Sequence, residues 1–271
     1  MRRVPVKWSY PYGTPEVEAD ILGMRGDPED VLTALAGLGY DGVELFVRDP
    51  TRIDLAALDA AVAAAGLAVT AIGTGPAVAD DKLTFTDPHA AVRSAAVART
   101  VSVIDLAAHY DSQVNIGKLR GRTRGHPDAR RWMRECLLES AEHAARVGVT
   151  LTLEPQNGSV IDNLNTTQAG VEFVRELGHP NVALMVDIYH AQIEDRRPSL
   201  AYLIAGDQLR HVHFADSNRG APGRGNIDFG LHVATLTALG YQGAVTFELD
   251  QRDDSLATAA EALAHLTTLD R

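Results

Sequence analysis

The sequence predicts an α/β fold, a single-domain (β/α)8 barrel over residues 1–271, on three observations. Short apolar segments of strand character alternate with longer Ala- and Leu-rich segments of helical period from one end of the chain to the other. Eight such units in 271 residues match the size of a (β/α)8 barrel. An open doubly wound sheet has a Gly-rich phosphate turn after its first strand, whereas SYPYG (9–13) follows the first predicted strand here.

The predicted strands and helices follow one another in regular order. The strands are expected at 3–9, 42–47, 68–74, 113–119, 149–155, 182–188, 210–215 and 244–249. The helices are expected at 28–39, 54–66, 88–109, 128–147, 166–178, 197–207, 229–240 and 255–268. The segments GLGYDG (37–42) and LGYQG (239–243) each end a helix and begin a strand, because glycine favours helix C-termini. The longest irregular segments are expected as loops over the carboxyl-terminal face of the barrel: 9–27, 74–87 and 216–228.

The composition excludes several classes of protein. Hydrophobic residues make up 45% and charged residues 23% of the chain, as in an ordinary globular protein. The 25 Lys and Arg against 36 Asp and Glu give a net charge of −11, which disfavours a nucleic-acid partner. A single cysteine, Cys136, can form neither an internal disulfide nor a sulfur-rich metal site, so it is expected to pack inside a cytoplasmic protein. No signal-peptide pattern and no run of 18 apolar residues occurs, so no membrane partner is expected.

The predicted strands of the carboxyl half carry ligand-type side chains at their carboxyl ends. These are Glu154, Asp187, His213 and Glu248, at intervals of 33, 26 and 35 residues, or one βα unit each. Because side chains alternate along a strand, these four face the barrel interior while their apolar neighbours face the helices. Four adjacent strands therefore direct three carboxylates and one imidazole to one point on the carboxyl-terminal face.

Such a cluster is a suitable donor set for a divalent cation. Three carboxylates in close contact would raise one another's pKa strongly, and a bound cation removes that repulsion. Three oxygen donors and one nitrogen suit Mn²⁺, Mg²⁺ or Co²⁺ better than a sulfur-preferring ion. A single strand-end carboxylate would more often cap the following helix, but four ligand-type residues in register favour a metal site.

At these residues the sequence resembles the xylose-isomerase-like TIM barrel family of sugar and sugar-phosphate isomerases and epimerases. The resemblance is closest to the ketose 3-epimerases and the keto-gluconate epimerase branch, and it extends over nearly the whole chain. The segments that carry it are IGTG (72–75), LTFTDP (83–88), RGR (120–122), LEPQN (153–157), LNT (164–166), DIYH (187–190), QIE (192–194), HVHFADSNR (211–219), PGRG (222–225) and FE (247–248).

The resemblance implies a role for each matching residue. The implied metal ligands are Glu154, Asp187, His213 and Glu248, holding one divalent ion, with Mn²⁺ expected first and Mg²⁺ or Co²⁺ left open. The two glutamates also match the acid and base of the family, and His190 and Arg219 match residues that hold the carbonyl end of the substrate. This division agrees with the chemistry, because a carboxylate on each face of an α-hydroxyketone can remove a proton and return one to the opposite face.

One position departs from the ketose 3-epimerase pattern. Those enzymes have a third glutamate six residues after the first, where this chain has Val160, with Asp162 two residues further on. The glutamate contacts the terminal-hydroxyl side of the substrate, and a valine cannot accept that hydrogen bond. We therefore expect a carboxylate-bearing or shorter keto sugar, whose charge meets Arg219, with Arg224 or an arginine of segment 118–124 as further candidates.

Other side chains have two interpretations each. Trp8, near the end of the first predicted strand, is either a wall of the sugar site or a plug of the barrel, and Arg224 is either a surface arginine or a contact to a substrate anion. Both are included among the candidates for substrate binding. His211 is expected as a hydrogen-bonded core histidine, with support of the metal site as the alternative, and Glu44 is left unassigned. The cations after the fourth strand are expected as loop or surface charges rather than an anion pocket: Lys118, Arg120, Arg122 and Arg124.

These observations together predict a metal-dependent epimerase of a small keto sugar or keto sugar acid, acting next to the ketone. A hydroxypyruvate-type or aldose–ketose isomerase is the first alternative, because EPQN (154–157) and DIYHAQI (187–193) also resemble that group. An inosose isomerase or dehydratase would use the same site. A metal-dependent abasic-site endonuclease would need a basic face, and a non-catalytic sugar-binding barrel would not need the glutamates. A homo-oligomer is left open.

Overall fold

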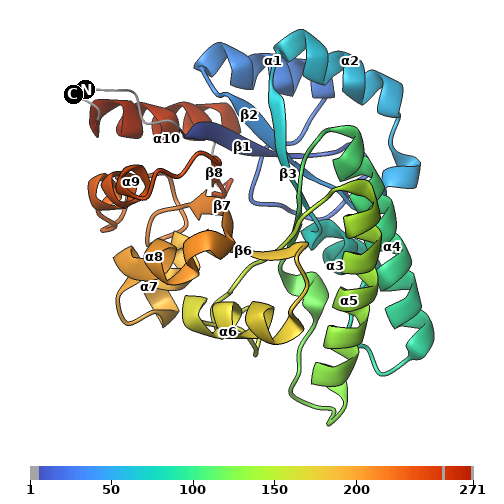
Figure 1. Cartoon of the computed structure of the whole chain (residues 1–271). Helices are drawn as coiled ribbons and strands as arrows, with labels where there is room; N and C mark the ends of the chain where they lie inside the picture. Colours follow the sequence, from blue (N-terminus) through green and yellow to red (C-terminus); the bar gives the residue numbers. More distant parts are fainter. Residues whose placement is uncertain (1–5, 252–253, 270–271) are drawn as a thin grey trace.

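Eight parallel strands close into a barrel in the order of the chain, as the computed structural model shows for residues 6–251 and 254–269 (Figure 1). The strands are β1 (Lys7–Gly13), β2 (Gly42–Phe46), β3 (Ala68–Gly73), β4 (Val114–Ile116), β5 (Leu151–Leu153), β6 (Val182–Asp187), β7 (Leu209–Phe214) and β8 (Ala244–Phe247). The predicted (β/α)8 barrel is confirmed. Closure of the barrel leaves none of these strands with an exposed edge.

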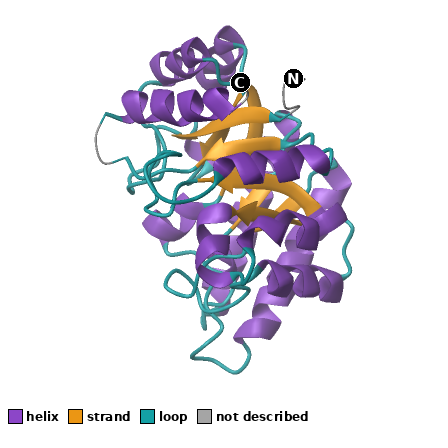
Figure 2. Ribbon diagram, turned by 90° about the vertical axis from the view of Figure 1, so that its left-hand side faces the viewer, coloured by secondary structure: helices purple, strands orange, loops and turns teal. Residues whose placement is uncertain are grey.

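Helices surround the barrel, with α1 beside α2 and α4 beside α5, so that the strands occupy the centre of the molecule (Figures 1 and 2). The helices are α1 (Pro28–Leu38), α2 (Leu55–Ala65), α3 (Gly75–Asp81), α4 (Ala90–His109), α5 (Ala129–Val147), α6 (Thr167–Leu177), α7 (Ile188–Glu194), α8 (Ala201–Ala205), α9 (Phe229–Ala238) and α10 (Ser255–Leu269). Short 3₁₀ turns lie at Pro50–Arg52, Lys118–Arg120, Pro198–Leu200 and Gly206–Gln208. None of the helices in the described ranges is long and apolar enough to cross a lipid bilayer.

The ends of the helices follow from local sequence. Asp27 caps α1 by accepting from the backbone N–H groups of the first turn, and Pro28 stands where no intrahelical N–H donor is needed. Gly39 ends α1 with a φ of 99°, a left-handed conformation that a residue with a Cβ adopts at a cost. The chain then enters β2 three residues later, as the GLGYDG segment predicts.

The first strand differs from its prediction, which placed it at 3–9. Residues 3–5 lie outside the described ranges, and β1 continues to Gly13 through Pro11. The pairing of β1 with β8 ends at Ser9, and on that side of the strand the Pro11 carbonyl accepts from Met24 N–H at 2.8 Å. The missing N–H of Pro11 therefore removes no ladder bond, and the strand tolerates the proline.

Two helices that the sequence prediction missed lie in connections above the barrel. Helix α3 forms within the predicted loop 74–87, and α7 begins directly after β6, where Asp187 accepts from Tyr189 N–H at 2.8 Å. The predicted helix at 197–207 is reduced to a 3₁₀ turn and the short α8. Cys136 is buried with its Sγ 3.8 Å from the Phe85 carbonyl oxygen, which fits the packing role expected of it.

Candidate active site

Four side chains meet at the carboxyl-terminal end of the barrel. Glu154 directly follows β5, Asp187 ends β6, His213 lies one residue before the end of β7, and Glu248 directly follows β8. The strand register places Asp187 beside His213. One ligand atom from each residue lies within 4.8 Å of the others, so the spatial convergence predicted from the sequence is present.

The cluster contains two buried polar atoms without a hydrogen-bond partner. These are Oε1 of Glu154 and Nδ1 of His213. The Nδ1 atom lies 3.6 Å from Glu248 Oε2 and 3.9 Å from Asp187 Oδ2. Buried polar atoms are normally satisfied, so two such atoms without a partner in a cluster of carboxylates fit a cation site. Three carboxylates and one imidazole are a donor set for Mn²⁺, Mg²⁺ or Co²⁺, as the sequence predicts.

Arg219 lies against this cluster. Its guanidinium donates to Asp187 Oδ2 at 2.7 Å, contacts Glu248 Oε2, and stands 4.6 Å above the ring centroid of Tyr189. The loop after β7 holds Arg219 in a left-handed conformation, with φ 62°. Asp216 orders that loop, because its fully buried carboxylate accepts backbone N–H groups from three positions between 217 and 227. The loop therefore presents Arg219 to two carboxylates and an aromatic face at once.

Burial and the neighbouring charges shift the pKa values of the site in different directions. Burial raises the pKa of Glu154, and the Asp187 charge adds to this effect against the opposing influence of His213. Burial also acts to raise the pKa of Asp187, but the neighbouring positive groups, Arg219 first among them, together outweigh burial and lower that pKa overall. Burial lowers the pKa of His190 to about 4, which makes its imidazole neutral at pH 7.

His190 presents a hydrogen-bond donor to the cluster. Asn157 Nδ2 lies 2.8 Å from His190 Nδ1, and since the amide nitrogen can only donate, Nδ1 accepts and Nε2 carries the proton. That Nε2 lies 3.6 Å from Glu154 Oε1 and 3.8 Å from Asp187 Oδ2. A neutral imidazole with an outward N–H suits a carbonyl or hydroxyl oxygen of a ligand.

Two adjoining hollows open onto the cluster, and both are lined by Leu22, Lys118, Gln156 and Glu248. The first is also lined by Glu154 and His213, by loop residues after β1 and by residues 73–76 after β3. The second extends past His190 and Arg219 to Val160, Tyr189, Asn218 and Asp250. The predicted loops after β1, β3 and β7 therefore do border the site.

Two of the predicted substrate-binding residues lie elsewhere. Trp8 stacks on Phe247 at 5.6 Å between ring centroids and lines neither hollow. The prediction placed Trp8 near the carboxyl end of its strand, but β1 begins at Lys7, so Trp8 lies near the amino end of β1 and its ring packs against Phe214 and Phe247. Arg224 is paired with Glu261 of α10 at 2.6 Å and lines neither hollow.

The sequence prediction did not foresee the contacts that three residues make with Glu154. Gln156 Nε2 donates to Glu154 Oε2 at 2.7 Å. Arg120, expected as a loop or surface charge, is instead fully buried and donates to the Glu154 carbonyl at 2.8 Å and to Asn163. A Cβ at Gly117 would lie 2.6 Å from Glu154 Oε2, so only glycine allows this approach. Gln156 could have been found from the sequence, because it lies two residues after Glu154 in the EPQN segment. No sequence signal distinguished the buried Arg120 from its exposed neighbours.

Comparison with known proteins agrees with this geometry. The model of the family described as "Xylose isomerase-like TIM barrel" matches residues 32–269. The L-ribulose 3-epimerase of Mesorhizobium japonicum is 32% identical over 233 residues, which cover 83% of this chain and 76% of that enzyme. The chain belongs to the xylose isomerase-like TIM barrel family. This confirms the resemblance inferred from the sequence.

Two further proteins extend the comparison. The D-allulose 3-epimerase of Methylomonas sp., solved in complex with D-allulose, has a TM-score of 0.82 at 23% identity, over 97% of this chain and 96% of that one. At that identity the likeness shows a shared fold. The 3-dehydro-D-guloside 4-epimerase of Escherichia coli is 36% identical over 126 residues, 46% of this chain and 48% of that enzyme. The chain is an enzyme of the isomerase and epimerase class, of the 3-epimerase type.

Proposed function

We propose that this enzyme is a divalent-metal-dependent epimerase of a keto sugar or keto sugar acid, inverting the carbon next to the ketone. The observation that carries the proposal is the convergence of Glu154, Asp187, His213 and Glu248 on one point, flanked by the donors His190 and Arg219. The sequence similarity to sugar epimerases supports it.

The metal would be held by the four residues of the cluster, with Mn²⁺ expected first from the family resemblance, while the same donors also suit Mg²⁺ and Co²⁺. A bound divalent cation would hold the carbonyl and adjacent hydroxyl oxygens of an α-hydroxyketone and offset the negative charge that develops there. The orphaned Glu154 Oε1 and His213 Nδ1 support this assignment.

The two glutamates are placed to move the proton. Glu154 and Glu248 follow β5 and β8, the first and last of the four adjacent strands that form the cluster, so they flank the bound substrate. One carboxylate removes the proton from the carbon next to the ketone, giving an enediolate of the substrate, and the other returns a proton to the opposite face. His190 and Arg219 donate hydrogen bonds to the oxygens of the carbonyl end and orient it.

We further propose that the substrate differs from fructose at one end. Val160 lines the second hollow beside Tyr189 and offers no acceptor to a terminal hydroxymethyl group. Among the cations considered for a substrate carboxylate, Arg120 is buried on backbone carbonyls and Arg224 is paired with Glu261. Lys118 is exposed and lines both hollows, so it joins Arg219 as the candidate for a substrate anion.

An isomerase would share the same residues and return the proton to the neighbouring carbon, so the outcome at the substrate decides the reaction. The Mn²⁺-loaded enzyme is incubated in D₂O with a panel of ketoses, keto acids and 3-keto glycosides, and deuterium is located by NMR. Label at C3 of a 2-ketose supports the epimerase, and label at C1 indicates the isomerase. No exchange with any substrate would overturn the proposal. Cytoplasmic location remains a prediction from the single cysteine.

A further inference from the structure

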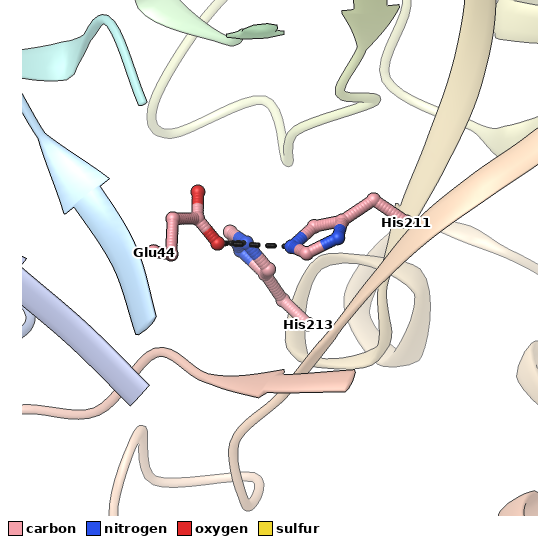
Figure 3. Close-up of side chains that lie close together, drawn as sticks. All are labelled: Glu44, His211 and His213. Carbon is pink, nitrogen blue, oxygen red and sulfur yellow. Dashed lines mark hydrogen bonds and ion pairs between the residues drawn. The ribbon is translucent and has the colours of Figure 1, made fainter. Parts of the chain in front are cut away.

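A buried carboxylate on the amino half of the barrel reaches the metal-ligand candidate His213. Glu44 of β2 is fully buried, and its Oε2 lies 2.9 Å from Nε2 of both His211 and His213 (Figure 3). Its Oε1 accepts from Asn115 Nδ2 at 2.7 Å. Strands β2 and β7 are not neighbours in the barrel, so this contact crosses its interior.

These contacts determine which nitrogen of His213 faces the cluster. A carboxylate whose two oxygens both receive N–H groups is an acceptor only, so each histidine Nε2 donates to Glu44. In neutral His213 the proton is then on Nε2, and Nδ1 keeps its lone pair. Nδ1 is the buried atom without a partner, and it faces Asp187 and Glu248.

We infer that Glu44 is a positioning residue for His213. The inference rests on the proposed function in one respect only, namely that the ligand of Nδ1 is a metal ion. Glu44 fixes the ring orientation and, in the neutral imidazole, the tautomer, so that Nδ1 is directed at the cation site before any cation binds. Without it, the ring could place a proton on Nδ1, and a cation would then have to displace that proton.

The rest of the interior layer keeps Glu44 in place. Thr152 donates its hydroxyl proton to Asn115 Oδ1, which leaves the Asn115 amide N–H₂ directed at Glu44. On the other side Thr246 lies 3.1 Å from His211 Nε2. The carboxylate is thus held by donors from β4 and β7, and its position does not depend on a ligand.

Two substitutions separate the hydrogen bond from the charge. Glu44→Leu removes both the acceptor and the charge. Glu44→Gln loses only the charge, because its amide oxygen still accepts from the histidines when the side-chain amide of Asn115 rotates to present its oxygen to the new amide N–H₂. Ser9→Ala is the matched control, because it removes another fully buried polar group of the interior, a hydroxyl bonded to Thr70, without touching this network.

The first readout is the His213 tautomer in metal-free protein, observed by ¹⁵N NMR of the imidazole. We expect the Nε2–H form in the wild type, Ser9→Ala and Glu44→Gln, and a mixture of tautomers in Glu44→Leu. The second readout is the affinity for Mn²⁺ alone, measured by titration calorimetry. Glu44→Leu should lose about 10- to 100-fold and Glu44→Gln less than about tenfold, while Ser9→Ala should bind as the wild type does.

Several outcomes would overturn the inference. One is a Glu44→Leu variant with an unchanged tautomer and unchanged Mn²⁺ affinity. Another is a wild-type stoichiometry of two Mn²⁺ per chain that falls to one in Glu44→Leu, because Glu44 would then be a ligand itself. If Glu44→Leu does not fold, the wild type carries the test, and a neutral His213 with its proton on Nδ1 in the metal-free wild type would overturn the inference. A wild type that binds no Mn²⁺ would refute the proposed function, and the tautomer would still test Glu44.

Discussion

Removal of divalent cations should lower the thermal stability of this enzyme measurably. Glu154, Asp187 and Glu248 offer oxygens within 4.8 Å of one another, and Arg219 supplies one positive charge against two of them. A cation that binds the folded chain at 100 times its dissociation constant adds about 2.7 kcal/mol of stability. Unfolding entropy of about 2.1 cal/mol/K per residue over 271 residues is about 0.57 kcal/mol/K, so the expected rise in Tm is about 5 °C.

The measurement is differential scanning calorimetry of the chelated protein with and without added Mn²⁺. Asp187→Asn removes one ligand and should abolish most of the Mn²⁺-dependent rise, while Arg224→Ala, on the surface pair with Glu261, should keep all of it. Turnover should be lost on chelation and restored by Mn²⁺, Co²⁺ or Mg²⁺. Protein shown to be metal-free by elemental analysis, yet fully active and unchanged in Tm on adding each of these ions, would refute the site assignment.

The other predictions concern individual side chains. Glu154→Gln and Glu248→Gln should each lower kcat by about 10²-fold or more in steady-state assays, and a variant with near-normal kcat and metal still bound would identify its residue as a spectator. Val160→Glu should raise kcat/KM for free fructose by about 5- to 150-fold, the equivalent of about 1–3 kcal/mol for a newly paired hydroxyl, and should impair any acidic substrate. Fructose turnover by the wild type comparable with its best keto acid would argue against that reasoning. Arg219→Met should lower kcat/KM about tenfold or more, whereas Arg224→Ala should stay within about twofold because an exposed ion pair contributes little. Equal losses in both would contradict the different positions of these arginines.

The barrel and its cluster could be predicted from the sequence because both depend on local patterns. Strand parity sends alternate side chains inward, and parallel strands all end on one face, so Glu154, Asp187, His213 and Glu248 had to converge once the strands were identified. The register shift between Leu184 and Met185 of β6 does not disturb this, because Asp187 remains paired with His213.

The positions that the prediction missed depend on contacts between distant segments. An error of four residues in the start and end of β1 was enough to move Trp8 from the carboxyl end of that strand to its amino end. Arg224 belongs to a motif of the family, but its partner Glu261 lies on α10, where no spacing rule could place it. Glu44 lies in an otherwise apolar strand, which was a signal of a functional or paired carboxylate, yet its partners are 167 and 169 residues away.

The metal-ligand candidates lie on or directly after strands, whereas the residues near the far end of the substrate lie in loops, and this arrangement explains how one fold can act on different sugars. The four ligand candidates and the Glu44 contact lie on strands or directly after them, where a change would disturb the barrel itself. Val160 and Lys118, by contrast, lie in the connections after β5 and β4, and they border the hollow where the far end of a substrate would lie. Loops tolerate substitution better than strands, so the substrate end can change while the proton-transfer residues stay fixed. The identity of the substrate therefore depends on the loop residues of this chain rather than on its cluster.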